Sequence, residues 1–347
     1  MKSYILILLI LAASIGLMAQ YALPITEYDY TVPENNVSPI VMGMGGLNIT
    51  SSVDAFGAYH NPALLAESEI TSLSTSFRLA KQRDLTFWQA MQISNTLREK
   101  QFQYFALSAK QFAFTYHPAA SVHLNEWNAT GDSLRYYDYK LDKVQLSLAG
   151  TDSKYPALKM GLSLKYYSGR LVYLKEHKLG VNLVRDVFID DKVKGFGTDI
   201  GLTVNSGDFT WGASVYDLFS RLYWENYPSE PVQRRMALGM EYKSGGAKLL
   251  GGLQYKVAKD PETSFHFGLD YDWNWQSSGL WGEGTADQGF AIRLGMFSND
   301  FYGTRNINYT VGTGYNYNLL RFDVSMTNRG MVLKDSDFLF AVGIGLK

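Results

Sequence analysis

The sequence contains no cysteine. This absence excludes a disulfide framework, a thiolate zinc site, an iron–sulfur cluster and a cysteine nucleophile. Charged residues make up only 19% of the chain, and 32 Lys and Arg balance 33 Asp and Glu to a formal net charge of -1. Phosphate binding needs a basic excess on some face. We therefore expect no nucleic-acid partner.

Long hydrophobic runs are also absent once the first 19 residues have passed. Residues 1–19 place Lys2 before the apolar run Ile5–Ala13 and end on the small residue Ala19. These features predict a Sec signal peptide cleaved before Gln20, and the alternative is an uncleaved anchor of barely sufficient length. With no later run of about 18 apolar residues, any further membrane span must be made of strands.

Aromatic residues and glycine are plentiful: aromatics reach 14%, and there are 32 Gly. From Glu69 onward, apolar residues occupy every second position, as in Phe265–Trp275, Ile307–Tyr317 and Phe338–Leu346. A period of two puts one face of each strand in an apolar medium and the other in a polar one. The chain is therefore predicted to be all-β.

The length and the ends of these runs indicate which apolar medium they meet. The runs are about nine to eleven residues long, the length of a tilted strand that crosses a bilayer. Small and polar residues fill one face, and aromatic residues gather at the ends of the other, as in outer-membrane barrels. The candidates for these aromatic girdles are Tyr166, Tyr167, Trp273, Trp275, Tyr315 and Tyr317. The alternative is a secreted β-sandwich or propeller with the same alternation.

The barrel is expected to occupy residues 69–347 with about 14 antiparallel strands and a polar lumen. Tight hairpin turns are predicted at Asn205–Asp208, Lys243–Ala247 and Asn316–Asn318, and longer loops at Asn125–Ser133, Asn226–Val232 and Gln276–Gln288. One stretch, Lys175–Lys194, carries apolar residues at a helical spacing. It fits a short amphipathic helix or a loop with two short strands, and we favour an irregular insertion.

Residues 20–68 do not alternate, and they are too polar and glycine-rich for a strand in lipid. We expect them to form a plug in the barrel mouth. The residues expected to contact the lumen wall are Met42, Gly43, Met44, Gly45, Gly46, Asn61 and Pro62. A phosphate-binding loop at Gly43–Gly46 is disfavoured because no strand, lysine and helix accompany it.

Strand parity assigns a set of mixed charges to the lumen wall. The candidates are Asp270, Asp272, Arg293, Arg321 and Asp323. Such a wall suits a plugged, salt-bridged interior better than a conduit for a fatty acid. Near the plug, Met42, Met44, Leu47, Leu64 and Leu65 either form an apolar pocket or simply pack on the wall.

The segment at residues 38–69, SPIVMGMGGLNITSSVDAFGAYHNPALLAESE, resembles the opening of the FadL-like outer-membrane proteins, and within them the PorV/PorQ family. The matching residues are Gly43–Gly46, Asp54-Ala55 and Asn61–Leu64. The resemblance implies a 14-stranded barrel in the outer membrane of a Gram-negative bacterium, in contact with its lipid.

Two functions follow from this resemblance. The first is a component of a type IX protein-secretion machine that binds the C-terminal domains of secreted cargo and other secretion proteins. The alternative is a FadL-like channel for hydrophobic small molecules. No nucleophile–base set or metal-ligand spacing of the five histidines stands out, so we expect no enzyme, cofactor or metal.

Overall fold

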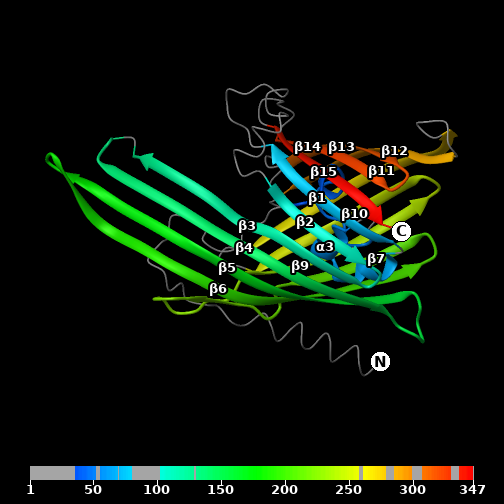
Figure 1. Cartoon of the computed structure of the whole chain (residues 1–347), viewed down its shortest axis with the longest axis horizontal. Helices are drawn as coiled ribbons and strands as arrows, with labels where there is room; N and C mark the ends of the chain where they lie inside the picture. The colour runs from blue at the N-terminus through cyan, green and yellow to red at the C-terminus, as the bar shows by residue number, and fades with distance from the viewer. Residues whose placement is uncertain are drawn as a thin grey trace.

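The computed structural model describes residues 36–51, 55–68, 70–79, 102–128, 130–257, 261–278, 285–298, 307–329 and 336–346. Within these ranges nearly every residue beyond 70 lies in a strand, and the strands run around a common interior (Figure 1). None of the described helices is long and apolar enough to cross a membrane. The predicted signal peptide, residues 1–19, lies outside the described residues.

The described chain contains fifteen strands, all antiparallel to their neighbours. Their bounds are β1 (Thr71–Leu79), β2 (Phe102–Ala109), β3 (Phe112–Trp127), β4 (Ser133–Thr151), β5 (Leu158–Leu179), β6 (Asn182–Ser206), β7 (Phe209–Tyr216), β8 (Arg221–Trp224), β9 (Arg234–Ser244), β10 (Ala247–Val257), β11 (Glu262–Ser278), β12 (Thr285–Ser298), β13 (Ile307–Tyr317), β14 (Leu320–Arg329) and β15 (Ser336–Leu346).

Fourteen of these described strands close into a barrel. Each strand pairs with its neighbour in the sequence, except that β7 pairs with β9 and that β1 pairs with β15 to close the ring. The short strand β8 lies outside this ring order and pairs with β6 in the connection between β7 and β9. The predicted 14-stranded antiparallel barrel is confirmed, and each backbone edge is paired as a lipid environment requires.

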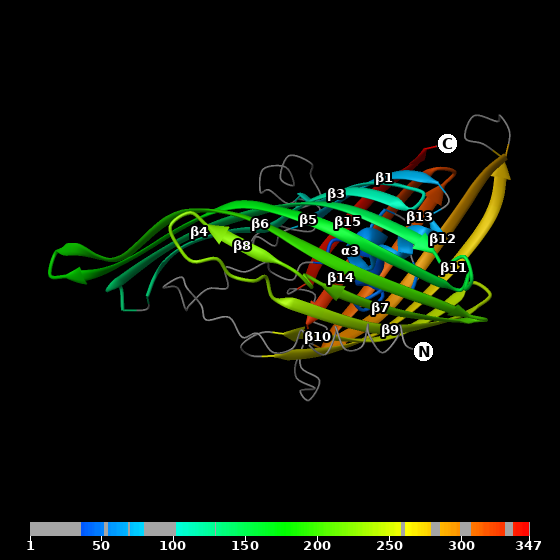
Figure 2. The ribbon, with the colours of Figure 1, turned by 90° about the horizontal axis from the view of Figure 1, so that it is seen from below.

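The two ends of the barrel differ. One end carries the turns at Gly207-Asp208, Gly245-Gly246 and Asn318-Leu319, together with the start of β1 and the end of β15. At the other end β3 to β6 extend past the remaining strands as an arm, visible at the left of Figure 2. Outer-membrane barrels keep short turns on the periplasmic side. By that convention we call the end with the short turns the periplasmic end and the end with the arm the extracellular end.

The outer surface is apolar along the body of the barrel. Leu164, Trp273 and Leu294 expose between 44% and 56% of their surface, whereas Ser163 and Asp270, on the opposite face of their strands, are buried. The predicted girdle residues Tyr166, Trp273, Trp275 and Tyr315 are exposed in this way. Tyr167 is a correction: it is fully buried, because a residue adjacent to an outward-facing tyrosine must point inward.

The predicted insertion at Lys175–Lys194 is also wrong. These residues form the paired ends of β5 and β6, with a bulge between Lys175 and Glu176 and a turn at Gly180-Val181. The helical spacing of Leu179, Leu183 and Val187 is a coincidence within this β-hairpin. The loop predicted at Gln276–Gln288 is shorter than expected, because β11 continues to Ser278 and β12 begins at Thr285.

Candidate functional site: a lumen divided by the N-terminal segment

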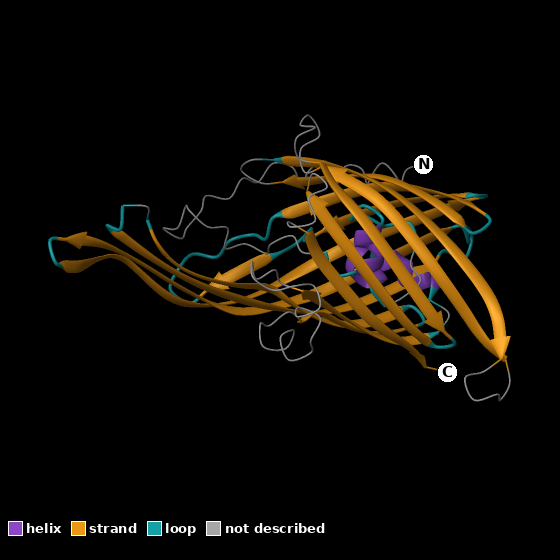
Figure 3. Cartoon of the chain, turned by 90° about the horizontal axis from the view of Figure 1, so that it is seen from above, coloured by secondary structure: helices purple, strands orange, loops and turns teal. Residues whose placement is uncertain are grey.

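The described residues 36–51 and 55–68, together called the N-terminal segment below, lie inside the ring of strands. They contain the helices α2 (Pro39–Gly43) and α3 (Gly57–His60) and the 3-10 helix η2 (Pro62–Glu67), drawn in purple between the strands in Figure 3. Most of their side chains are buried. The segment therefore occupies the lumen partway between the two barrel ends.

Local sequence signals shape this segment. Ser38 caps α2 by accepting a hydrogen bond from the Val41 amide at 3.3 Å, and Pro39 follows at the first helical position. Asn61 caps η2 in the same way, with its Oδ1 3.0 Å from the Ala63 amide and Pro62 next in the chain. After α2, Gly45 and Gly46 have φ near +83° and +82°, a region that residues with a Cβ rarely adopt.

The glycine run touches the wall through backbone. A Cβ on Gly43 would lie 2.9 Å from the Cα of Gly312, and one on Gly45 would collide with the Phe267 carbonyl. Thr310 completes this contact, since its hydroxyl accepts from the Gly45 amide at 3.0 Å and donates to the Gly43 carbonyl at 3.1 Å. His266 Nδ1 donates to the Gly45 carbonyl at 2.6 Å.

Asn61 and Pro62 meet the opposite wall in the same manner. Asn61 Nδ2 donates to the Leu202 carbonyl at 3.1 Å and to the Ile49 carbonyl at 2.7 Å. A Cβ on Gly201 would collide with Asn61 Oδ1, and one on Gly161 with the backbone of Pro62 and Ala63. The two residue groups predicted from the sequence thus lie at opposite sides of the lumen.

A partial ring of inward-facing glycines, called the glycine ring below, contacts residues 43–49 and 61–63 of the segment. Each of eight consecutive barrel strands, β5 to β7 and β9 to β13, contributes one glycine on which a Cβ would meet the N-terminal segment. In strand order they are Gly161, Gly201, Gly212, Gly239, Gly252, Gly268, Gly295 and Gly312. Several of them are direct register partners, such as Gly212 with Gly239 and Gly268 with Gly295. This ring was not predicted from the sequence, because its members lie on eight different strands.

The methionines and leucines of the segment are separated from one another. Met44 packs with Ile40 and Leu250, whereas Leu47 packs with Ile49, Tyr216 and Ala237. Leu65 belongs to a third cluster with Ala58 and Ala113. These contacts are ordinary packing of segment on wall, so the single apolar pocket considered from the sequence is not formed.

The five charged residues predicted for the lumen wall form a connected ladder. Arg293 Nε lies 3.1 Å from Asp270, and Arg293 Nη1 lies 2.8 Å from Asp323. Asp270 also pairs with Lys248 at 2.9 Å, and Asp323 with Arg321 at 2.7 Å. The ladder joins β10, β11, β12 and β14 on the periplasmic side of the glycine contacts, and Lys248 also pairs with Asp272 at 2.8 Å. Removal of one member of such a buried network would leave an uncompensated charge in the interior, which strongly destabilises a protein.

A second charged cluster lies on the other wall. Lys165 Nζ is 2.6 Å from Asp199 and 3.1 Å from Asp217, and the Tyr167 hydroxyl donates to Asp217 at 2.8 Å. All four side chains are buried. Parity placed Lys165 on the inner face, but its two carboxylate partners come from β6 and from the end of β7, which only the folded sheet brings together.

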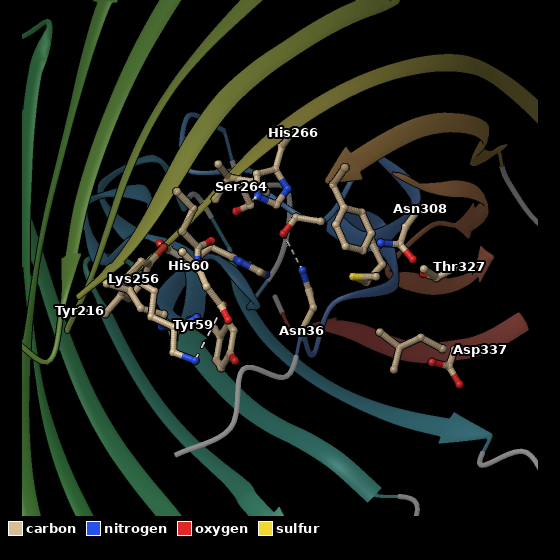
Figure 4. Close-up of a pocket in the computed structure, with 18 of the residues that line it drawn as sticks. Asn36, Tyr59, His60, Tyr216, Lys256, Ser264, His266, Asn308, Thr327 and Asp337 are labelled. Carbon is tan, nitrogen blue, oxygen red and sulfur yellow. Dashed lines mark hydrogen bonds and ion pairs between the residues drawn. The ribbon is translucent and has the colours of Figure 1, made fainter. Parts of the chain in front are cut away.

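A cavity of about 480 Å³ opens on the extracellular side of the N-terminal segment (Figure 4). Its floor is formed by Met42, Gly46 and Leu47, with Tyr59 and His60 alongside. Charged wall residues reach it from the strand ends, namely Arg78, Arg235, Lys256, Glu262 and Asp337. Three cations against two carboxylates, with Tyr216 and Phe297 also in the lining, give a mixed polar and aromatic site.

A second cavity of about 480 Å³ lies on the periplasmic side of the same segment. Its apolar part comes from Leu64, Leu65 and Ile70, and its polar part includes Asp272 and Arg321 of the ladder. The two cavities share none of their lining residues. The N-terminal segment is therefore a partition between two halves of one lumen.

Burial of His60 gives the partition a neutral imidazole. Desolvation, followed by the positive charges of Arg235 and Lys143, lowers the pKa of His60 to about 3. Its Nε2 has no hydrogen-bond partner in the described chain, while its carbonyl accepts from the Tyr216 hydroxyl. Arg235 stacks on the Tyr216 ring at 4.8 Å and Lys143 on the Tyr59 ring at 4.7 Å. The sequence offered no signal for these contacts.

The described residues contain no group of three or more His, Cys, Asp or Glu that could hold a metal ion. In the extracellular cavity the Ser264 hydroxyl lies 2.9 Å from His266 Nε2, and the other nitrogen of that ring donates to the Gly45 carbonyl at 2.6 Å. The two cavities offer charged groups, hydrogen-bonding groups and aromatic surface for the recognition of a solute.

No family model matches the sequence, and no curated protein matches it either. The fold, in contrast, is similar to solved structures. The toluene transporter TbuX of Ralstonia pickettii superposes with a TM-score of 0.56 at 12% identity, over 90% of this chain and 99% of that chain. The toluene transporter TodX of P. putida gives 0.56 at 9% identity, over 91% and 98%. A TodX mutant described as a monoaromatic hydrocarbon channel gives 0.52 at 9%, over 89% and 97%. At these identities the likeness establishes a shared FadL-like barrel fold.

Proposed function

We propose that this protein is an outer-membrane channel for small organic solutes, with the N-terminal segment as its plug. The observation that carries the proposal is the pair of cavities, one on each side of a partition inside a closed barrel. A solute that crosses must pass from the charged extracellular cavity to the more apolar periplasmic one. The fold shared with toluene transporters supports the proposal of a channel for small organic solutes.

The lining favours an amphipathic solute over a bare hydrocarbon. Arg78, Arg235 and Lys256 are half-buried and line the extracellular cavity, where an anionic group of a solute would gain charge-assisted hydrogen bonds. Tyr59, Tyr216 and Phe297 offer aromatic surface for a planar or apolar body. A small aromatic carboxylate combines both properties and fits the available volume.

Uptake into proteoliposomes tests the proposal. Labelled benzoate should enter faster than into protein-free liposomes, and the double variant Arg78→Ala/Lys256→Ala should slow entry about tenfold. A matched control is Lys110→Ala/Lys154→Ala, which removes two exposed cations from periplasmic turns. Equal uptake with and without the protein would contradict the channel. Toluene uptake that is as fast as benzoate uptake and unaffected by the double variant would contradict the anionic solute.

A type IX secretion component is the second candidate, and the arm formed by β3 to β6 favours it. Val181 at its tip is 94% exposed and Leu179 is 67% exposed, a surface that a cargo domain could cover. A deletion strain that lacks secreted proteins sharing one C-terminal domain would support this candidate. An unchanged set of secreted proteins would contradict the secretion candidate and leave the channel as the remaining proposal.

A further inference from the structure

The N-terminal segment does not separate the two cavities equally on every strand. On β1 and β15, which are neighbours in the wall (Figure 1), only one inward-facing residue lies between the lining of one cavity and that of the other. From the extracellular to the periplasmic lining, the residues are Arg78, Ser76 and Ser74 on β1 and Leu339, Ala341 and Gly343 on β15. The strand advances about 13 Å from Arg78 to Ser74.

The partition is thicker on β11 to β14, where two inward-facing residues lie between the linings. In strand order these pairs are Gly268 and Asp270, Gly295 and Arg293, Gly312 and Thr310, and Asp323 and Ser325. They include three members of the glycine ring and the centre of the charged ladder. The thinnest part of the partition therefore lies along β1 and β15.

A single row of register partners, called the thin row below, forms the wall at this place. In strand order from β2 through β1 and β15 to β14, its members are Tyr104, Ser76, Ala341 and Asp323. All four are buried. The residues of the N-terminal segment that cover the thin row are thus the barrier between the two cavities on this side of the lumen.

Packing alone holds this cover against β1 and β15. Val37 and Phe56 of the segment form one buried cluster with Tyr104 and Ala341, and the rings of Phe56 and Tyr104 stack with their centroids 5.4 Å apart. In the described chain, the segment's hydrogen bonds to strands reach β4, β5, β6, β7, β9, β11 and β13, and none reaches β1 or β15. The cover can therefore leave these two strands without breaking a hydrogen bond to them.

Polar groups are lined up across the thin row. Arg78 lies in the extracellular cavity, and Arg321, the register partner of Gly343, lies in the periplasmic one. Between them, the Ser76 hydroxyl is fully buried and has no hydrogen-bond partner in the described chain. A buried hydroxyl without a partner is unfavourable, and a carboxylate that passes this point would supply the missing acceptor.

The carboxylate of the thin row does not oppose such a passage. Asp323 is paired on two sides, with Arg293 Nη1 at 2.8 Å and with Arg321 Nε at 2.7 Å. Its negative charge is therefore compensated within the wall before any solute arrives.

We propose that the solute crosses the partition along β1 and β15, over the thin row, when Val37 and Phe56 move away from it. The Ser76 hydroxyl then contacts the anionic group of the solute midway between Arg78 and Arg321. This inference rests on the proposed channel function, and it adds the route and the hydroxyl that the solute meets inside the partition.

Benzoate uptake into proteoliposomes tests the position of the route. Phe56→Ala should raise uptake about tenfold, because the lost ring leaves a cavity over the thin row. The matched control is Met44→Ala, which removes an equally buried side chain of the segment where it packs with Ile40 and Leu250, away from β1 and β15. The control should leave uptake unchanged. An equal increase in both variants, or no increase with Phe56→Ala, would overturn the route.

Thiol labelling tests the same route without a solute. The chain has no cysteine, so Ser76→Cys provides a single thiol. In the Phe56→Ala background this thiol should react with a small charged methanethiosulfonate about tenfold faster than that of Thr203→Cys, since thiol reactivity requires access. Thr203 is the matched control because its hydroxyl, on β6, is equally buried and also has no partner in the described chain. Equal labelling rates contradict the route.

The two measurements separate this inference from the channel proposal. Fast labelling of Ser76→Cys without any benzoate uptake by the wild type would contradict the channel function and support an opening along β1 and β15. Uptake by the wild type with equal effects of Phe56→Ala and Met44→Ala would contradict the route and keep the channel.

If Phe56→Ala does not fold, Ala341→Leu decides instead. Its longer side chain fills the contact with the segment and should slow benzoate uptake about tenfold. The control is Ala237→Leu, a change at a buried alanine that packs with Leu47 and Ile49 on β9. Equal uptake by the two leucine variants would overturn the route.

Discussion

At the scale of single residues, the wall glycines act through the side chain they lack. Gly295 lies where a Cβ would collide with the Gly45 amide, and its register partner Gly268 lies against the Met44 carbonyl. The absent side chains let two backbones approach, and the hydrogen bonds of Thr310 and His266 then become possible. The position of the N-terminal segment thus depends on the wall as much as on the segment.

A methyl group at this contact should displace the segment. We expect Gly295→Ala to destabilise the protein by about 1–3 kcal/mol, the cost of overpacking a filled interior. The matched control is Gly251→Ala, where a Cβ meets nothing within 4 Å. The measurement is the urea midpoint in lipid vesicles, together with protease cleavage of the N-terminal segment. Equal stability and equal protection of the two variants would show that the segment does not rest on these glycines.

His60 predicts a pH dependence. Its pKa falls from 6.5 in the unfolded chain to about 3 in the folded one, because burial and the nearby Arg235 and Lys143 disfavour the charged ring. The unfolded chain therefore takes up a proton that the folded one refuses, and stability is lost as the pH falls from about 6.5 toward 3. The slope contributed by this single residue is at most about 1.4 kcal/mol per pH unit.

His60→Gln should flatten this part of the stability profile. The measurement is the urea midpoint between pH 7 and pH 4 for the wild type and the variant. His177→Gln is the control, since His177 is exposed on the arm and pairs with Asp186. A wild-type profile with the same slope as that of His60→Gln would mean that His60 is not the residue that resists protonation.

At the scale of elements, the charged ladder connects β10, β11, β12 and β14 along one wall of the lumen. Arg293→Met removes the cation between Asp270 and Asp323 and leaves two buried carboxylates facing each other. We expect a loss of about 3–5 kcal/mol, the cost of breaking a buried pair. Arg170→Met breaks an exposed bidentate pair with Asp190 and should cost at most about 1 kcal/mol.

Comparison of these two variants in one unfolding assay checks the ladder. Both remove an arginine from a strand, so the difference between them reports burial and not the loss of the side chain itself. Equal costs would contradict the idea that the ladder is a sealed, low-dielectric network.

Most of the fold could be predicted from the alternation of apolar and polar residues in the sequence. It predicted the strands around Phe265–Trp275 and the inward placement of Asp270 and Arg293, because parity along one strand needs no knowledge of its neighbours. Pairing between strands was out of reach: Lys165 meets Asp199 and Asp217 only after the registers of β5, β6 and β7 are set. The same limit hid the glycine ring, since its eight members lie on eight strands.

The arm was missed for a different physical reason. From Lys175 to Val187 neither face of the hairpin is buried, so neither face must be apolar and the alternating signal disappears. What remains is a chance helical spacing of leucine and valine in a hairpin of ordinary geometry. Sequence periodicity reports the solvent on each side of a strand, and it is silent where both sides are water.

At the scale of the whole molecule, the N-terminal segment is the obstacle that a solute must pass in order to cross the barrel. The two cavities lie on opposite sides of the N-terminal segment, and a solute must pass between the segment and the wall or displace it. Thr50 and Ser51 lie at one such boundary, where both hydroxyls donate to Glu241 of β9, at 3.2 and 2.5 Å. A covalent tie at this boundary should hold the partition closed.

Because the chain has no cysteine, Thr50→Cys/Glu241→Cys contains only the two introduced thiols. A short thiol crosslinker should lower benzoate uptake into proteoliposomes at least tenfold, and a reductant should restore it. The control is Gln276→Cys/Asp287→Cys, a hydrogen-bonded pair on neighbouring strands at the periplasmic end, far from the segment in register. Uptake that survives the Thr50–Glu241 crosslink would mean that solute does not require the segment to move, and the route would then have to run through the wall itself.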